Sequence, residues 1–238
     1  SLYAAPASIL GEEALHRAIE ATGLQDELQR LEQLPLIDWP AATRARQTLL
    51  RQLYQDFIRQ AHPLDADFQH FRQRGGEALE NHCRFEALQE LCVAEQHSLD
   101  WRDWPEQWRN PDSPALLQFA EEHRQTIAYY AFCQWLIASC LERAQATARA
   151  SGMAIGLIAD LAVGADGAGS QAWCRQDELL AQLTVGAPPD ALNRAGQGWG
   201  ISAFSPEGLK RSGFRAFTEM LRANFAHARD IDGQMATR

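Results

Sequence analysis

The chain has 238 residues, of which 46% are hydrophobic and 22% are charged, and it carries a formal net charge of −9. These values are typical of a soluble globular protein with one large domain or two modest ones. The acidic balance argues against nucleic acid as a partner. The lack of a long apolar run or a signal peptide predicts no membrane partner and a cytoplasmic location.

The cysteines indicate a reduced chain. Their number is odd, and no two of them form a CxxC pair. They lie mostly in apolar surroundings typical of helices, so we expect buried thiols. The five positions are Cys83, Cys92, Cys133, Cys140 and Cys174.

Residues 11–97 have the apolar spacing of helices. Up to about residue 60, apolar side chains recur every three to five positions, with an interruption at Gly23. A proline-containing loop at 36–40 then precedes a long helix, and a second helical block covers residues 65–97. The inward face expected for the long helix consists of Leu49, Leu50, Leu53, Tyr54, Phe57 and Ile58. The face expected for the second block consists of Phe68, Phe71, Leu79, Cys83, Leu88 and Leu91.

Three tryptophans, Trp101, Trp104 and Trp108, lie in a short segment punctuated by prolines. Indole rings so close together can stack on sugar rings, or they can anchor a loop into a corner of the core. We favour the anchor and keep the sugar platform as the alternative.

The sequence Asp112-Ser113-Pro114 predicts a helix start, because it combines a capping side chain with a proline in the first turn. We expect this helix to run to about Ala150, where Ser151-Gly152 ends it. His123 lies on its apolar face. We interpret it as a core or interface histidine and expect no metal, because nothing beside it offers metal-ligand spacing.

The last third of the chain has the order of an α/β unit. Residues 154–163 are short, nearly all apolar and flanked by helical patterns, which is typical of a strand buried on both faces. A short helix near 172–183, a helix over 206–225 and a strand at 228–232 are expected to follow. We therefore divide the chain into a helical region, 1–150, and an α/β piece, 151–238.

Two carboxylates, Asp160 and Asp232, follow the two expected strands. In barrel-type α/β folds, catalytic groups lie at such strand ends, and sugar transfer needs two carboxylates on opposite sides of the scissile bond. From spacing alone, each aspartate can equally be a helix cap or a turn former.

Residues 185–200 form a loop rich in glycine and proline. Pro188-Pro189 stiffens the backbone, whereas four glycines permit tight turns. Asp190, Gln197 and Trp199 then project hydrogen-bonding and aromatic groups from a rigid frame, as an oligosaccharide subsite requires. The alternative is an ordered connection, but the two nearby acids favour a site.

Gly186-Ala187-Pro188-Pro189-Asp190, followed by Gly196-Gln197-Gly198-Trp199-Gly200, resembles the signature loop of the amylomaltases. These are the 4-α-glucanotransferases of glycoside hydrolase family 77. Residues 156–164 are similar to the third barrel strand of the family, and residues 85–88 and 131–136 are similar to its helical insertion.

The resemblance implies an α/β fold, namely part of a (β/α)8 TIM barrel with a large, mainly α-helical subdomain. It implies transfer of α-1,4-glucan segments between maltodextrins by a retaining double displacement without a cofactor. Asp232 matches the aspartate that becomes glycosylated, and Asp160 matches a substrate-binding aspartate. Asp190, Gln197 and Trp199 match the loop that contacts the glucan.

The sequence departs from the family around Asp232. The family has an arginine two residues before its nucleophile and a histidine directly after it, where this chain has Asp230 and Gly233. A carboxylate at 230 is expected to raise the pKa of Asp232 and to weaken it as a nucleophile. The proton-donating glutamate of the family lies further downstream than Arg238. We therefore expect little transferase activity from this chain alone, and self-association through an unclosed barrel surface.

A different class of function stays open beside the transferase. In that hypothesis the chain is a non-catalytic maltodextrin-binding or helical interaction module that binds through Asp190, Gln197 and Trp199. A helical domain whose loop resembles the family by accident is a third, blander alternative.

Overall fold

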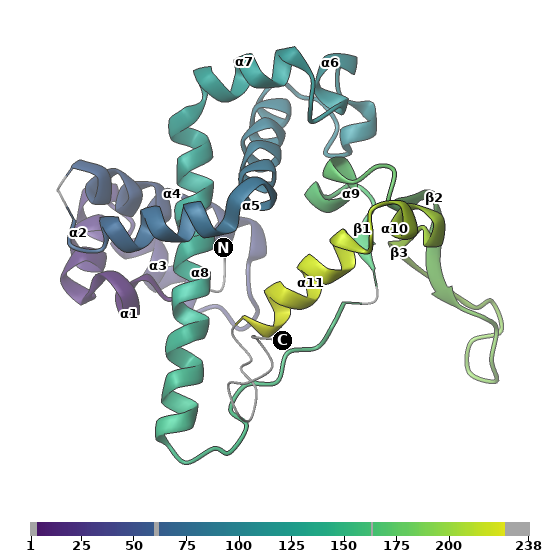
Figure 1. Cartoon of the computed structure of the whole chain (residues 1–238). Helices are drawn as coiled ribbons and strands as arrows, with labels where there is room; N and C mark the ends of the chain where they lie inside the picture. The colour runs from purple at the N-terminus through teal and green to yellow at the C-terminus, as the bar shows by residue number, and fades with distance from the viewer. Residues whose placement is uncertain (1–3, 60–61, 163, 227–238) are drawn as a thin grey trace. The chain divides into compact units, whose positions relative to one another are not determined.

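Helices make up most of the computed structural model, which describes residues 4–59, 62–162 and 164–226 (Figure 1). The first helices are α1 (Pro6–Leu10), α2 (Glu12–Thr22), α3 (Gln25–Glu32), α4 (Trp39–Arg59) and α5 (Asp65–Ala94). They are followed by the 3-10 helix η1 (Trp101–Asp103) and by α6 (Glu106–Arg109), α7 (Pro114–Glu122) and α8 (Arg124–Ala150). The remaining elements are β1 (Ala165–Asp166), α9 (Ser170–Cys174), β2 (Leu179–Ala187), β3 (Gln197–Phe204), α10 (Pro206–Arg211) and α11 (Arg215–Phe225).

The chain contains two compact units. Unit 1 consists of residues 1–76 and 128–144, and unit 2 consists of residues 77–127 and those from 145 onward. Helices α5 and α8 therefore contribute to both units. Within α5, the backbone of Gly76 leaves the helical conformation with φ +53°, and this is also the residue at which the first part of unit 1 ends. The expected division near residue 150 stays a prediction.

Local signals begin and end the helices of unit 1. Gly23 adopts a left-handed conformation at φ +64° and ends α2, as the interruption in the apolar pattern predicts. Asp38 precedes α4, and its Oδ1 atom accepts a hydrogen bond from the amide of Ala41 at 3.0 Å. This bond satisfies one of the amides that the first turn of a helix leaves unpaired.

Aromatic rings from three helices form the core of unit 1. Phe57 of α4 lies 5.2 Å from Phe132 of α8 and 5.8 Å from Phe68 of α5, measured between ring centroids. The indole of Trp135 joins this cluster and donates a hydrogen bond of 2.8 Å to the Asp67 carboxylate. The predicted inward face of α4 is confirmed from Leu49 to Phe57, but Ile58 is 48% exposed and was wrongly included.

Unit 2 has a separate aromatic core. The ring of Phe85 stacks on Trp104 at 5.2 Å and lies 5.6 Å from the ring of Trp173. The Trp101 indole donates to the carbonyl of Gly167, and the Trp104 indole donates to the carbonyl of Ser98. Both indoles are buried, so the anchor interpretation is confirmed for these two tryptophans, and they offer no sugar platform.

Two predicted helices are each interrupted. Ser113 caps α7 as expected, but the helix ends at Glu122 because His123 has φ −109° and ψ 25°. The His123 ring stacks on Phe119 with 4.3 Å between centroids, so it has a packing role. The helix expected over 206–225 ends at Arg211, and Phe214 at φ +60° separates α10 from α11.

The strand expected at 154–163 does not form over residues 154–162. This part of the chain has no strand or helix, and Asp160 is exposed within it. The physical reason is the lack of a neighbouring strand among the described residues. Instead, the buried Gln145 side chain of α8 donates to the carbonyl of Ile155 and accepts from the amide of Leu157 at 2.6 Å.

Exposed apolar side chains remain along the same segment. Ile158 is 78% exposed and Ile155 is 47% exposed. An apolar run that lacks a covering element leaves such surface. Self-association through this surface stays a prediction.

The strands that the structure describes form one antiparallel sheet in the order β1-β3-β2. Residues 179–183, expected to be helical, instead belong to β2, while the short helix α9 ends at Cys174. Their leucines, alanine and glutamine favour helices, so pairing with β3 overrides the local propensity. A parallel barrel sheet is not found among the described residues, and the strand expected at 228–232 lies outside them.

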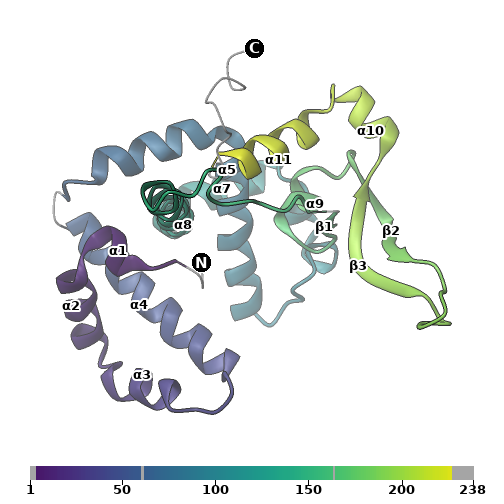
Figure 2. The same ribbon diagram turned by 90° about the horizontal axis from the view of Figure 1, so that it is seen from below.

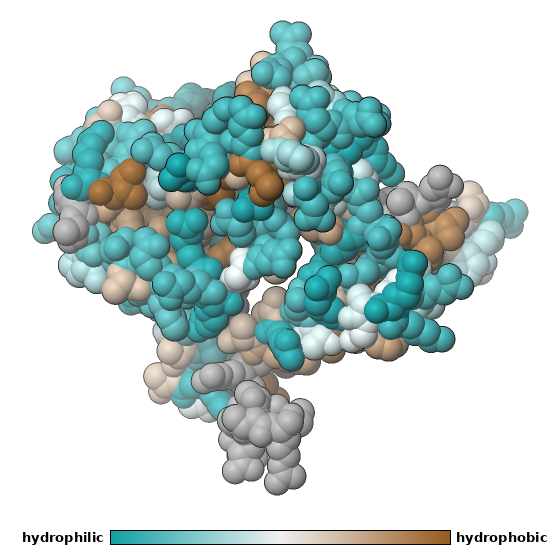
Figure 3. Space-filling model, turned by 45° about the horizontal axis from the view of Figure 1, so that its top comes forward, coloured by the Kyte–Doolittle hydropathy of each residue, from teal (hydrophilic) through white to brown (hydrophobic). Residues whose placement is uncertain are grey.

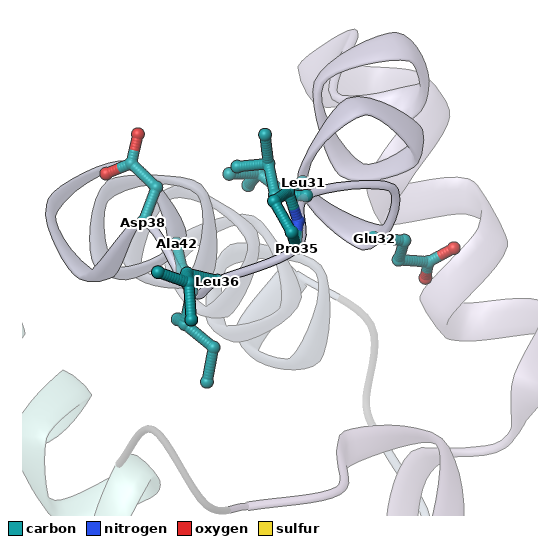
Figure 4. Close-up of a pocket in the computed structure, with 8 residues that line it drawn as sticks. Leu31, Glu32, Pro35, Leu36, Asp38 and Ala42 are labelled. Carbon is teal, nitrogen blue, oxygen red and sulfur yellow. The ribbon is translucent and has the colours of Figure 1, made fainter.

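The surface is mostly hydrophilic on the face that Figure 3 shows, with apolar side chains in small patches. On the loop between α3 and α4, Leu36 is 83% exposed and Ile37 is 62% exposed. A cavity of about 400 Å³ opens there. Figure 4 shows Leu31 and Pro35 between the carboxylates of Glu32 and Asp38. None of the described helices is long and apolar enough to cross a membrane.

Burial of the leucines in unit 1 predicts a large difference between two identical substitutions. Leu50 is fully buried, whereas Leu36 is 83% exposed. We expect Leu50→Ala to lower the free energy of unfolding by about 2–5 kcal/mol through lost apolar burial and a cavity. The control Leu36→Ala should change it by less than about 0.5 kcal/mol. Urea denaturation followed by circular dichroism measures both, and equal effects would contradict the described core.

The cysteines generate a second prediction. Cys83, Cys92 and Cys133 are buried, in agreement with the expected buried thiols, and Cys140 and Cys174 are half-buried. Burial raises the pKa of Cys92 to about 11 and that of Cys174 to about 12. Because only the thiolate attacks, raised pKa values lower reactivity at neutral pH and shift its onset to alkaline pH.

At pH 8 we therefore expect Ellman's reagent to label Cys92 and Cys174 more slowly than Cys140, with all five thiols reacting in guanidinium chloride. Mass spectrometry of the labelled peptides identifies each site. Fast labelling of Cys174 in the folded chain would contradict its surroundings.

Candidate functional site

The loop singled out in the sequence is largely a β-hairpin. Residues 185–187 belong to β2 and residues 197–200 belong to β3, so only residues 188–196 form its loop. Both views show β2 and β3 as a long ribbon that projects beyond α10 (Figures 1 and 2). The hairpin therefore presents the expected polar and aromatic side chains on strands as well as on a loop.

Glycine permits the two strands to approach closely. Gly186 lies opposite Gly198, and a Cβ atom at Gly186 would overlap the carbonyl oxygen of Gln197. Gly196 closes the loop with φ +72°, a conformation that other residues rarely adopt. The expected role of glycine in the tight turns is confirmed at Gly196 by this positive φ.

Asp190 organises the loop that it begins. Its Oδ1 atom accepts hydrogen bonds from the amides of Leu192 at 2.8 Å and of Asn193 at 2.6 Å. Its own amide donates to the carbonyl of Asn193 at 3.0 Å. This arrangement is the Asx turn that aspartate commonly forms. Both side-chain bonds end on Oδ1, so the Oδ2 atom is left to accept from a ligand.

Gln197 and Trp199 act as a pair on β3. They are two residues apart, and a hydrogen bond joins their side chains. The indole Nε1 of Trp199 donates to the Oε1 atom of Gln197 at 3.0 Å. Trp199 is nevertheless 47% exposed. The bond restrains an indole whose ring remains accessible to a ligand.

Of the two predicted carboxylates, the structure describes Asp160, and it is not joined to this hairpin. Asp160 lies on the irregular segment before β1, and among the described residues no hydrogen bond or ion pair connects it to Asp190, Gln197 or Trp199. Asp232 lies outside the described residues. The structure thus joins Gln197 to Trp199 and places Asp190 in the loop of the same hairpin. The roles of Asp160 and Asp232 stay predictions.

A buried carboxylate at the base of the hairpin was missed in the sequence. Glu178 directly precedes β2, and its Oε2 atom accepts from the Ser212 hydroxyl at 3.0 Å. Arg175 lies 3.5 Å from the other carboxylate oxygen and also pairs with Glu219. Ser212 is 34 residues from Glu178 and Glu219 is 44 residues from Arg175, so the local sequence could not indicate these two contacts.

Metal chemistry has no candidate site among the described residues. In residues 4–59, 62–162 and 164–226, no group of three histidine, cysteine, aspartate or glutamate side chains is arranged to hold a metal ion. What the hairpin offers is hydrogen-bonding groups and an aromatic ring.

The Asx turn predicts opposite outcomes for two substitutions at Asp190. Asparagine keeps the Oδ1 acceptor, so Asp190→Asn should leave the loop closed, whereas Asp190→Ala removes both bonds. Since one such bond contributes about 1 kcal/mol, we expect the Leu192 and Asn193 amides to exchange with solvent at least about fivefold faster in the alanine variant. NMR-detected hydrogen exchange measures this. Equal exchange in both variants would contradict the loop-closing role of the carboxylate.

Comparison with known proteins places this chain, including the hairpin, in a family. The model of the glycoside hydrolase family 77, described as 4-alpha-glucanotransferase, matches residues 2–231. The 4-alpha-glucanotransferase of Mycobacterium bovis is 32% identical over 200 residues, which are 84% of this chain and 27% of that protein. The enzyme of the same name from Haemophilus influenzae is 27% identical over 86% of this chain and 30% of that protein.

Two solved amylomaltase structures also match this chain. The amylomaltase of Corynebacterium glutamicum matches with a TM-score of 0.60 and 28% identity, over 79% of this chain and 24% of that one. The amylomaltase of Streptococcus agalactiae, solved in complex with acarbose, matches with a TM-score of 0.72 and 16% identity, over 90% and 44%.

The chain spans less than a third of the length of the two curated relatives named above. Its described part is helix-rich and matches part of the two amylomaltase structures. Because the family model matches residues 2–231, this chain belongs to the 4-alpha-glucanotransferase family, glycoside hydrolase family 77.

Proposed function

We propose that this chain supplies a glucan-binding part of a 4-alpha-glucanotransferase and that its β2–β3 hairpin contacts an α-1,4-glucan. The observation that carries the proposal is the exposed Trp199 indole, whose N–H group is already bonded to Gln197. Its ring can pack against the apolar face of a pyranose, while the Gln197 amide group and the Asp190 Oδ2 atom bind hydroxyls.

The family supports the choice of ligand. The relatives are named 4-alpha-glucanotransferases, and the structure from S. agalactiae holds acarbose. In the proposed fold, residues 151–238 form part of a (β/α)8 barrel and residues 1–150 form a helical subdomain.

The proposed reaction is transfer of an α-1,4-glucan segment with retention. The Asp232 carboxylate attacks the anomeric carbon, the bond to the leaving 4-oxygen breaks, and a carboxylic acid protonates that oxygen. A 4-hydroxyl of a second glucan then replaces Asp232 and returns its proton to the same acid. Asp160 is proposed to bind substrate. The proton-donating acid is not assigned in this chain.

A non-catalytic maltodextrin-binding module is the second candidate. The observation in its favour is Asp230, since this carboxylate two residues before Asp232 should raise the pKa of Asp232 and make it a weaker nucleophile. Binding of a maltodextrin through the hairpin needs neither Asp230 nor Asp232. A helical interaction module would need no glucan at all.

Titration with maltoheptaose, followed by tryptophan fluorescence, tests the binding that both candidate functions share. Trp199 and Trp39 are 47% and 54% exposed, which makes them matched positions. We expect Trp199→Ala to weaken binding about two- to twelvefold and to remove most of the fluorescence change, because an aromatic contact contributes about 0.5–1.5 kcal/mol beyond its burial. The control Trp39→Ala should retain both. If the unsubstituted chain does not bind maltoheptaose, the proposal is wrong.

Incubation with maltotriose tests whether this chain catalyses transfer by itself. Glucose together with longer maltodextrins identifies transfer, and Asp232→Asn should then abolish the products while leaving maltoheptaose binding intact. Binding without products agrees with the little transferase activity expected of this chain alone, and both the glucan-binding part and the non-catalytic module predict it.

A further inference from the structure

Strand β3 contains extra residues at the position that carries Trp199. Gly186 of β2 pairs with Gly198, and the next recorded pair is Thr184 with Ser202. Between these pairs β2 has only Val185, whereas β3 has residues 199–201. The unpaired residues of such a bulge leave the hydrogen-bonding ladder and redirect their side chains. Trp199 therefore projects from an irregular strand.

The hydroxyl of Thr184 binds the backbone inside this bulge. Gly200, with φ +69°, donates its amide hydrogen to the Oγ1 atom of Thr184 at 3.0 Å. The same hydroxyl donates to the carbonyl of Val185 at 3.1 Å. Accepting one bond and donating another requires a hydroxyl, which valine lacks and serine retains. The Thr184 side chain thus supplies a contact that the ladder does not provide.

We propose that Thr184 is a positioning residue for glucan binding, because its hydroxyl fixes the bulge at Gly200 and thereby sets the direction of the Trp199 indole. The inference rests on the proposed function, in which Trp199 contacts the glucan. The indole is half exposed and so has little packing to orient it. Its orientation then depends on the backbone beside it and on the bond to Gln197.

Two substitutions at Thr184 separate positioning from strand stability. Valine is nearly isosteric with threonine and favours strands, so a purely structural role would tolerate Thr184→Val better than Thr184→Ser. Positioning by the hydroxyl predicts the reverse order. We expect Thr184→Val to weaken maltoheptaose binding roughly fivefold and Thr184→Ser to remain within about twofold of the parent.

A second readout does not depend on the ligand. The indole Nε1–H resonance of Trp199, assigned with Trp199→Phe, reports its environment in NMR spectra of the ligand-free chain. Thr184→Val should shift this resonance and Thr184→Ser should restore it. The resonances of the buried Trp104 and Trp173 should stay in place, which shows that each variant is folded.

The two readouts distinguish the possible failures. If the parent does not bind maltoheptaose, the proposed function is wrong. The role of Thr184 in glucan binding is then wrong as well. The NMR resonance would still show whether the Thr184 hydroxyl orients Trp199. If the parent binds and Thr184→Val keeps both the resonance and the affinity, positioning by Thr184 is overturned. A shifted resonance with unchanged affinity also overturns it, because the orientation of Trp199 would then not matter for binding.

Discussion

The position of the β2–β3 hairpin depends on the contacts at its base, where Glu178 directly precedes β2. A two-stranded hairpin that packs against few other residues is only marginally stable by itself. In this hairpin, Leu192 in the loop is 98% exposed and Trp199 is half exposed. At the base, by contrast, the carbonyl of Glu178 accepts from the amide of Ser205 at 2.8 Å, and its buried carboxylate binds Ser212 and Arg175. A buried carboxylate is tolerated only with such partners, so this network fixes where the exposed ribbon begins.

Much of the helical region could be predicted from the sequence, because its signals are local. The α4 face from Leu49 to Phe57 follows from apolar spacing, and the start of α7 follows from Ser113 before a proline. The errors fall where a distant partner decides the structure. Residues 154–162 need a strand beside them that the described residues do not contain. Residues 179–183 belong to a strand because β2 pairs with β3 at Leu179 and again from Thr184.

In the candidate site too, the residue types could be predicted from the sequence, but their contacts could not. A rigid loop that bears an aspartate, a glutamine and a tryptophan was visible in the sequence. The bonds that Asp190 makes to its own loop and the bond between Gln197 and Trp199 depend on backbone geometry. Thr184 gave no signal at all, because its role appears only once the register shift between β2 and β3 is known.

These internal bonds bear on what the hairpin can select. Oδ1 of Asp190 and Oε1 of Gln197 are used within the protein, so Asp190 retains an acceptor and Gln197 retains its amide donors. A neutral pyranose has hydroxyls for both and an apolar face for the indole, whereas an anionic ligand would meet the Asp190 carboxylate and a net charge of −9. Because the loop and the indole are already restrained, binding orders fewer side chains, which lowers the entropic cost of recognition. The proposed preference for an uncharged glucan thus follows from the way in which the hairpin satisfies its own polar groups.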